Sequence, residues 1–194
     1  LSVLSAMREA STYHITVKGG RYMEAVAAAD TIVFDKTGTL TKARPQVADV
    51  VVFNGQDKNE LLRIAACLEE HFPHSMANAV VTEAVKRGLV HQEMHSRVDY
   101  IVAHGIATYV GDERVVIGSY HFVFEDEGCR IPEDGKEAFD SLPSEYSHLY
   151  LAIGGVLAAV ICIEDPLREE ADAVISALHR QGISKIVMMT GDSE

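Results

Sequence analysis

Basic residues are scarce in this sequence: 17 Lys and Arg stand against 29 Asp and Glu among 194 residues, for a formal net charge of −12. A nucleic-acid groove or an anionic membrane surface needs clustered positive charge, so neither kind of partner is expected. Cysteine is also rare, and Cys67, Cys129 and Cys162 lie far apart without a CxxC pair. This usage favours reduced thiols over a disulfide framework.

Long apolar runs are missing as well. No segment approaches the roughly 20 apolar residues that a membrane-crossing helix needs, and the N-terminus lacks the pattern of a secretory signal. The sequence nevertheless opens in the middle of an apolar pattern without a cap, and it ends soon after the apolar run KIVMM at 185–189. We therefore expect a soluble segment of a longer protein.

The patterns that are present indicate a mixed α/β chain. The apolar runs at 31–34 and 185–189 are short and continuous, which is typical of parallel strands covered on both faces. The block between them predicts helices that begin near Asp57 and Ser75, and short strands at 47–53, 98–102, 107–110, 114–117, 148–153 and 156–163. This order predicts an α/β unit interrupted by an α+β domain that has an antiparallel sheet and flanking helices.

The domain boundaries expected from these patterns are as follows. A helical connector covers residues 1–29, the outer α/β unit covers 30–47 and 159–194, and the inserted domain covers 48–158. The clearest helix pattern belongs to the outer unit. Asp165 stands as its N-cap, Pro166 at its first position, and Gly182 closes it.

Polar residues follow both apolar strands of the outer unit. Asp35, Lys36 and Thr37 come after the first strand, and Thr190 and Asp192 come after the second. Parallel strands end at the same edge of a sheet, where ligands bind, so Asp35 and Thr190 are expected there together. A carboxylate at that edge can attack phosphorus, while a lysine and hydroxyls neutralise or hydrogen-bond the phosphoryl oxygens. The alternative is that Asp35 only caps a turn.

The heptapeptide DKTGTLT at 35–41, after an apolar strand, resembles the signature of P-type ATPases, ion pumps with a haloacid dehalogenase-like phosphorylation domain. EDPLREEA at 164–171 and TGD at 190–192 resemble further motifs of that domain in the same order. AMREASTYHITVKGG at 6–20 resembles the connector from the membrane helices in the heavy-metal (type IB) subgroup. The resemblance covers essentially the whole chain and implies a partial Rossmann-like phosphorylation domain with an inserted nucleotide-binding domain.

The same resemblance implies a set of roles around Asp35. ATP would phosphorylate Asp35, with Lys36, Thr37 and Thr190 at the phosphoryl group. Mg²⁺ would be held by Asp35 and Thr37, with its remaining ligands beyond Glu194. The partners implied are an actuator domain and ion-binding transmembrane helices, at the cytoplasmic face of a cell membrane. Because the later part of the site would lie outside this chain, we expect at most feeble phosphorylation of the segment alone.

The inserted domain carries the nucleotide-site part of the resemblance. EEHFPHSMANAVV places Glu69 five residues before His74, the spacing of the subgroup, with Ser75 where proline is usual. The resemblance implies that Glu69, His74 and Gly105, the last residue of Ala103-His104-Gly105, bind the nucleotide. Asp192 would lie near it at the domain hinge. The alternatives are a surface histidine at 74 and a plain hairpin turn at 103–105.

Thr37 distinguishes between related functions. Haloacid dehalogenase-like phosphatases typically carry a second aspartate two residues after the nucleophile, as the acid and base that activates water. A threonine cannot do this, so an aspartyl phosphate should persist, as a pump requires. Two alternatives to the pump remain: an isolated ATP-binding module without turnover, and a soluble haloacid dehalogenase-type phosphotransferase.

Overall fold

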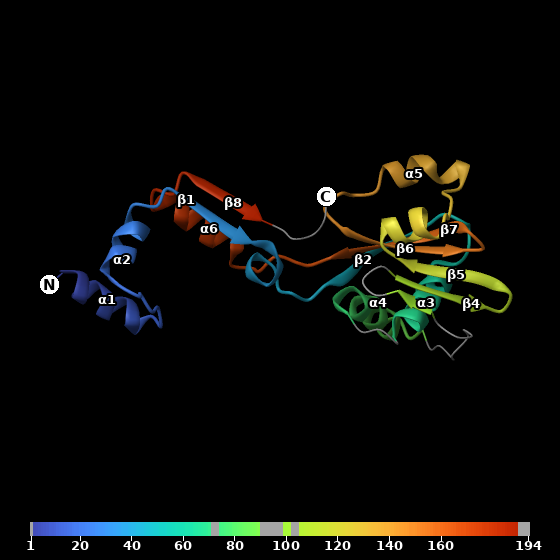
Figure 1. Ribbon diagram of the computed structural model, residues 1–194, viewed down its shortest axis with the longest axis horizontal. Helices are drawn as coiled ribbons and strands as arrows, with labels where there is room; N and C mark the ends of the chain where they lie inside the picture. Colours follow the sequence, from blue (N-terminus) through green and yellow to red (C-terminus); the bar gives the residue numbers. More distant parts are fainter. Residues whose placement is uncertain (1, 71–73, 90–98, 102–104, 190–194) are drawn as a thin grey trace. The chain divides into compact units, whose positions relative to one another are not determined.

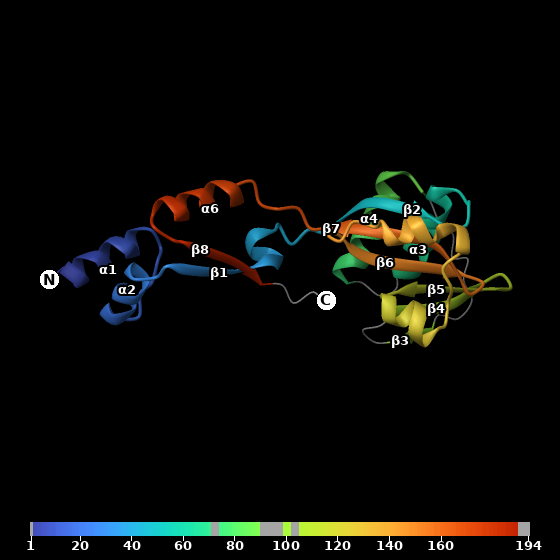
Figure 2. The same cartoon turned by 90° about the horizontal axis from the view of Figure 1, so that it is seen from above.

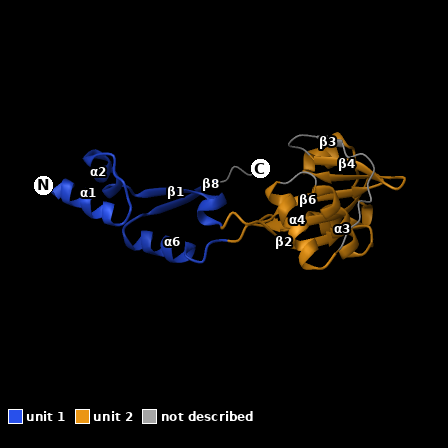
Figure 3. Cartoon of the chain, turned by 90° about the horizontal axis from the view of Figure 1, so that it is seen from below, with its two compact units in different colours: residues 1–41, 167–194 blue, residues 42–166 orange. Residues whose placement is uncertain are grey.

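The computed structural model describes residues 2–70, 74–89, 99–101 and 105–189, the central segment 99–101 by its backbone. It divides the chain into two compact units (Figures 1 and 3). Unit 1 comprises Leu1–Thr41 and Leu167–Glu194, and unit 2 comprises Lys42–Pro166. The chain therefore passes from one unit to the other twice, at Thr41–Lys42 and at Pro166–Leu167.

Unit 1 is built on two parallel strands. β1 (Thr31–Asp35) pairs in register with β8 (Lys185–Met189), so that Asp35 lies opposite Met189. The helices of the unit are α1 (Ser2–Thr12), α2 (Gly20–Ala27) and α6 (Ala171–Arg180). α6 lies beside the strand pair (Figure 2).

The strands of unit 1 are less covered than their apolar runs predict. Val33 of β1 is 53% exposed, and Met188 and Met189 of β8 are 53% and 62% exposed. α6 does not cover them completely. A hollow of about 360 Å³ remains between this helix and β8, and Leu40, Ile175 and Val187 are among the residues that line it. The expectation that both faces of the strand pair are buried is therefore wrong for the described part of the chain.

Unit 2 is a six-stranded sheet of antiparallel pairs with the order β2-β7-β6-β5-β4-β3. The strands are β2 (Gln46–Val52), β3 (Asp99–Ile101), β4 (Gly105–Val110), β5 (Glu113–Gly118), β6 (Ser147–Ile153) and β7 (Val156–Glu164). A two-glycine turn joins β6 to β7. Gly154 and Gly155 have φ angles of 60° and 77°, and these positive values match the twist that a tight hairpin requires.

Helical segments lie over both faces of this sheet (Figure 1), with an apolar layer under each. α3 (Lys58–Glu69) and α4 (Ser75–Lys86) cover one face, where Leu61, Val80 and Ile161 are fully buried. The short helix α5 (Lys136–Asp140) and the turn His121–Asp126 lie over the other face, around Phe122 and Tyr150. Unit 2 therefore has a core of its own on both sides of the sheet.

The mixed α/β class and the antiparallel insert expected from the sequence are both present. The units, however, divide at other residues than the expected 47/48 and 158/159, which lie inside β2 and β7. These two strands pair along their length, from Gln46 opposite Glu164 to Val52 opposite Ala159, so both belong entirely to the sheet of unit 2.

The helix expected from Asp165 begins later in the structure. α6 spans Ala171–Arg180 and has no side-chain cap bond at its N-terminus. The Asp165 carboxylate instead accepts the backbone N–H of Arg44 at 3.0 Å, and Leu167 forms an antiparallel bridge with Thr41. These long-range pairings occupy the residues that the local pattern assigned to the first turn, so the expected N-cap was wrong.

Candidate active site

Asp35 is the last residue of β1, and its side chain is exposed at the edge where β1 and β8 both end. Its backbone is extended (φ −71°, ψ 142°), and the chain turns sharply after it. The parallel pairing confirms the common edge expected for the two strands. Thr190 and Asp192, the other residues expected near that edge, lie outside the described residues.

The turn Lys36–Leu40 that follows Asp35 is shaped by one glycine and one threonine. Gly38 has φ 79°, the left-handed conformation that glycine adopts most easily. Thr41 is 1% exposed; its hydroxyl accepts the Gly38 N–H at 3.0 Å and donates to the Lys36 carbonyl at 3.2 Å. The expected site residues Lys36 and Thr37 thus belong to a turn that the hydrogen bonds of the Thr41 hydroxyl stabilise.

Arg168 contacts the same turn from the second segment of unit 1. Its guanidinium donates from Nη2 to the Gly38 carbonyl at 3.1 Å and from Nε to the Thr39 carbonyl at 3.0 Å. Its backbone N–H donates to the Leu40 carbonyl at 2.8 Å. The sequence reasoning assigned no role to Thr41 or Arg168, although both lie within its quoted motifs, DKTGTLT and EDPLREEA.

The donors at this edge are of the kind that Mg²⁺ prefers, namely carboxylate and hydroxyl oxygens. Asp35 and Thr37 supply them. Among the residues described, no group of three or more His, Cys, Asp or Glu side chains could hold a metal ion. The oxygen donors of Asp35 and Thr37 are thus chemically compatible with part of a magnesium site, and their role as ligands stays a prediction.

Glu69 and His74 lie together in unit 2. Glu69, at the end of α3, is 2% exposed, and its Oε2 is 3.0 Å from Nε2 of the half-exposed His74. At that distance the two side chains interact as an ion pair when His74 is charged. Yet within the part of the chain that the structure describes, Oε2 receives no directed hydrogen bond. The spacing seen in the sequence thus brings this pair of side chains into contact.

His74 also caps α4. Its Nδ1 accepts the Ala77 N–H at 3.3 Å, so the neutral ring carries its proton on Nε2. The contact with Glu69 raises the pKa of His74 above the ordinary 6.5, although partial burial opposes the shift. The helix expected to begin near Ser75 does begin at that residue, and His74 caps it.

Gly105 begins β4 and lies against Phe122. A Cβ on this residue would be 2.2 Å from Phe122 Cδ1 and 2.5 Å from the Ile117 carbonyl oxygen, much closer than atoms can approach. Packing alone therefore requires glycine here. No described contact joins Gly105 to Glu69 or His74, and Ala103 and His104 lie outside the described residues.

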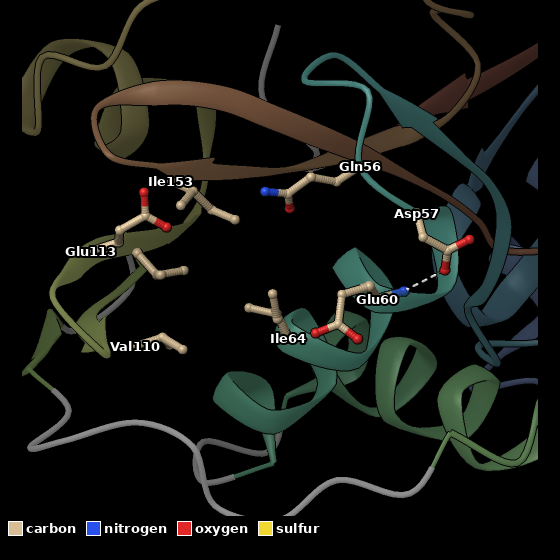
Figure 4. Close-up of a pocket in the computed structure, with 8 residues that line it drawn as sticks. Gln56, Asp57, Glu60, Ile64, Val110, Glu113 and Ile153 are labelled. Carbon is tan, nitrogen blue, oxygen red and sulfur yellow. Dashed lines mark hydrogen bonds between the residues drawn. The ribbon is translucent and has the colours of Figure 1, made fainter.

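A separate hollow of about 290 Å³ in unit 2 is lined by apolar side chains and three acidic ones (Figure 4). Two of its carboxylates have partners within the protein: Asp57 caps α3 by accepting the N–H groups of Asn59 and Glu60, and Glu60 pairs with Arg63. Glu113 completes the acidic lining. This hollow contains none of the site residues expected from the sequence.

The comparisons with known proteins agree with this geometry. A family model described as haloacid dehalogenase-like hydrolase matches residues 29–194. The chain belongs to that family. It is 34% identical over 187 residues to a zinc-transporting ATPase of Synechocystis sp., covering 95% of this chain and 24% of that protein. It is also 32% identical over 193 residues to a manganese-exporting P-type ATPase of Mycobacterium bovis, covering 98% of this chain and 27% of that protein.

A solved structure extends the same relationship. A zinc-transporting PIB-type ATPase in an E2.Pi state superposes with a TM-score of 0.71 and 27% identity, covering 97% of this chain and 30% of that one. The homologues of this haloacid dehalogenase-like chain are thus heavy-metal P-type ATPases, and it spans about a quarter of the length of the curated relatives it matches. Within its described residues, no helix is both long and apolar enough to span a membrane.

Proposed function

We propose that this chain is the cytoplasmic ATP-binding and phosphorylation region of a heavy-metal cation-translocating P-type ATPase, with Asp35 as the phosphorylated residue. The observation that carries the proposal is the placement of Asp35. It ends β1 beside the end of β8, exposed, and is followed by a turn held by Thr41 and Arg168. Ligands of open α/β sheets bind at such an edge.

The proposed reaction is a phosphoryl transfer. A carboxylate oxygen of Asp35 forms a bond to the γ-phosphorus of ATP, the bond from that phosphorus to the β,γ-bridging oxygen breaks, and ADP leaves with the electron pair. Lys36, Thr37 and Thr190 would neutralise or hydrogen-bond the oxygens of the transferred group. Mg²⁺, when held by Asp35 and Thr37, would offset phosphate charge.

The residue type at position 37 supports a lasting phosphoenzyme. Thr37 is the second residue of the turn that follows Asp35, and it offers a hydroxyl without a carboxylate that could activate water. Persistence of the aspartyl phosphate favours a pump over the alternative of a soluble phosphotransferase. In the whole protein, an actuator domain and ion-binding transmembrane helices would then use the phosphoenzyme.

The nucleotide would bind to unit 2. The buried Glu69 carboxylate, whose Oε2 lacks a directed hydrogen bond from described residues, is suited to accept one from the adenine edge. His74, next to it at the start of α4, supplies a nearby imidazole at a helix N-terminus, where anions are favoured. Gly105 and Asp192 complete the proposed nucleotide site. If unit 2 binds ATP and Asp35 is never phosphorylated, that result would support the alternative of an ATP-binding module without turnover.

The test is phosphorylation from ATP labelled at the γ-phosphate, in the full-length pump that contains this chain. We expect an acid-stable, hydroxylamine-sensitive phosphoenzyme that disappears in Asp35→Asn, while ATP still binds. Glu69→Gln should weaken ATP binding about tenfold, equivalent to about 1.4 kcal/mol. Glu125→Gln, an exposed carboxylate on another turn, is the matched control. Label that remains on Asp35→Asn would overturn the assignment of the nucleophile.

A further inference from the structure

Three successive carbonyl groups of the turn after Asp35 are bonded by one residue. Arg168 donates to Gly38 O from Nη2, to Thr39 O from Nε and to Leu40 O from its backbone N–H, at 3.1, 3.0 and 2.8 Å. The residues involved are separated by 129 and 130 positions in the two side-chain bonds. The turn is therefore fixed from outside by a distant segment of unit 1, in addition to the bonds of Thr41.

These bonds orient peptide planes. In a trans peptide the C=O and the following N–H point in opposite directions. A Gly38 carbonyl directed at the guanidinium therefore turns the Thr39 N–H away from Arg168, and a Thr39 carbonyl directed there does the same for the Leu40 N–H. Arg168 thus decides which face of the turn presents carbonyl oxygens and which presents donors.

The charge of Arg168 acts in the same sense. A phosphoryl group at Asp35 is strongly negative, and carbonyl oxygens directed at it would be repelled. The guanidinium draws two of these oxygens to itself, and its planar fork of donors holds them in a fixed relation. A lysine could bond one carbonyl but could not hold both in that geometry.

The backbone of Arg168 is anchored without its side chain. Its N–H bonds to Leu40 O, and the preceding residue, Leu167, forms an antiparallel bridge with Thr41. The side chain is exposed. A substitution at position 168 therefore removes the two guanidinium bonds and leaves the strand-like pairing of the backbone in place.

We propose that Arg168 is a positioning residue for phosphoryl transfer: its guanidinium holds the turn 36–41 in the shape that receives the phosphoryl group at Asp35. The inference rests on the proposed function, because it takes Asp35 as the acceptor. Arg168 acts through the turn and touches neither ATP nor the reacting atoms.

The experiment compares Arg168→Ala, Arg168→Lys and the control Arg180→Ala, an exposed arginine at the far end of α6, in the full-length pump. We expect Arg168→Ala to form the phosphoenzyme about tenfold more slowly, with its ATP affinity within about twofold of wild type. Arg168→Lys should fall between wild type and Arg168→Ala. Added methylguanidinium should restore part of the rate of phosphoenzyme formation in Arg168→Ala and should have no such effect on the other proteins.

A second readout does not depend on turnover. Amide hydrogen exchange of Gly38 and Thr41, whose N–H groups are bonded within the turn, should be about tenfold faster in Arg168→Ala and unchanged in Arg180→Ala. Wild-type rates of both phosphorylation and exchange in Arg168→Ala would overturn the inference. A slower rate with no methylguanidinium rescue and weakened ATP binding would overturn it too, since that indicates general structural damage.

The two proposals can fail separately. If wild-type pump forms no phosphoenzyme, the proposed function fails, and the exchange measurement still decides whether Arg168 fixes the turn. If wild type is phosphorylated on Asp35 and Arg168→Ala matches it in rate and exchange, only the role of Arg168 fails.

Discussion

Phe122 occupies the space that a side chain on residue 105 would need. The ring of Phe122 is fully buried, and a Cβ built on Gly105 would come within 2.2 Å of its Cδ1 and 2.5 Å of its Cε1. Gly105 does not have a positive φ, so backbone strain is not the reason for glycine here. The requirement comes from the close approach of β4 to an aromatic ring.

Gly105→Ala should therefore destabilise unit 2 whether or not a nucleotide binds there. Forcing a methyl group into a filled core costs roughly 1–3 kcal/mol, because the neighbours must shift or leave their rotamers. The free energy of unfolding, measured by urea titration without ATP, checks this value.

The double variant Gly105→Ala/Phe122→Leu separates the two explanations of the glycine. Leucine lacks Cε1 and can turn its Cδ atoms away from the new Cβ, so part of the lost stability should return even though Phe122→Leu alone lowers it. If the two effects simply add, Phe122 is not the obstacle. If stability is unchanged and only ATP binding weakens, the glycine serves the nucleotide and the packing argument is wrong.

Thr41→Val should loosen the turn after Asp35. Thr41 is almost fully buried, and its hydroxyl accepts the Gly38 N–H and donates to Lys36 O. Valine keeps the shape of threonine but removes this hydroxyl. Because Gly38 itself is exposed, the loss of each hydrogen bond should cost about 0.5–1.5 kcal/mol. Thermal unfolding of unit 1 should shift down, and phosphorylation of Asp35 should slow with it.

Thr41→Ser is the matched control for this prediction. Serine keeps the hydroxyl and loses only a methyl group, so it should retain most of the phosphorylation rate. Equal losses in the valine and serine variants would mean that packing of the methyl group, not the hydrogen bonds, maintains the turn.

The sequence predicts those parts of the fold that depend on local pattern. The apolar run ending in Asp35 and the run at 185–189 are strands because continuous β-forming residues favour parallel pairing, and they do pair. The helix start predicted at Asp165 was wrong because a contact between residues distant in the sequence replaces the local pattern there. Asp-Pro is a typical N-cap pattern, but the carboxylate bonds a backbone N–H 121 positions away.

The site shows the same division. Glu69 and His74 were singled out by the spacing that the family resemblance implies, and the structure brings their side chains into contact. The Arg168 contacts could not be predicted, because no local periodicity links residues 129 and 130 positions apart. The capping role of His74 could not be predicted either, because the preferred N-cap residues are Ser, Thr, Asp and Asn.

The pKa values of two histidines of unit 2 should be shifted in opposite directions from the ordinary value. Glu69 raises the pKa of His74 above 6.5, whereas burial lowers the pKa of His148, whose Nε2 is buried and has no described hydrogen-bond partner. NMR titration of the imidazole protons should therefore place the midpoint of His74 above 6.5 and that of His148 below it. Glu69→Gln should lower the His74 midpoint and leave that of His148 unchanged.

The signs for stability follow from proton linkage. The contribution of His74 is fully present below its unfolded pKa of 6.5 and is lost as the pH rises through its higher folded pKa. The unfolded state binds a proton at His148 more readily, so the stability of unit 2 decreases as the pH falls from 6.5 through its lower folded pKa. The free energy of unfolding, measured by urea titration at several pH values, has a slope against pH. The variants His74→Gln and His148→Gln should change this slope in opposite directions. Parallel changes would contradict the assignment.

A final pair of variants compares two glycines that share a left-handed backbone but differ in their surroundings. Gly38 (φ 79°) lies in the turn after Asp35, and Gly128 (φ 63°) lies in unit 2, where a Cβ built on it meets no atom within 4 Å. Alanine in this conformation costs roughly 1–2 kcal/mol, so both variants should lose similar stability. Only Gly38→Ala should also slow phosphorylation of Asp35, since the strain then acts on the turn that carries Lys36 and Thr37. Equal phosphorylation rates in Gly38→Ala and Gly128→Ala would show that the conformation of Gly38 does not matter to phosphoryl transfer.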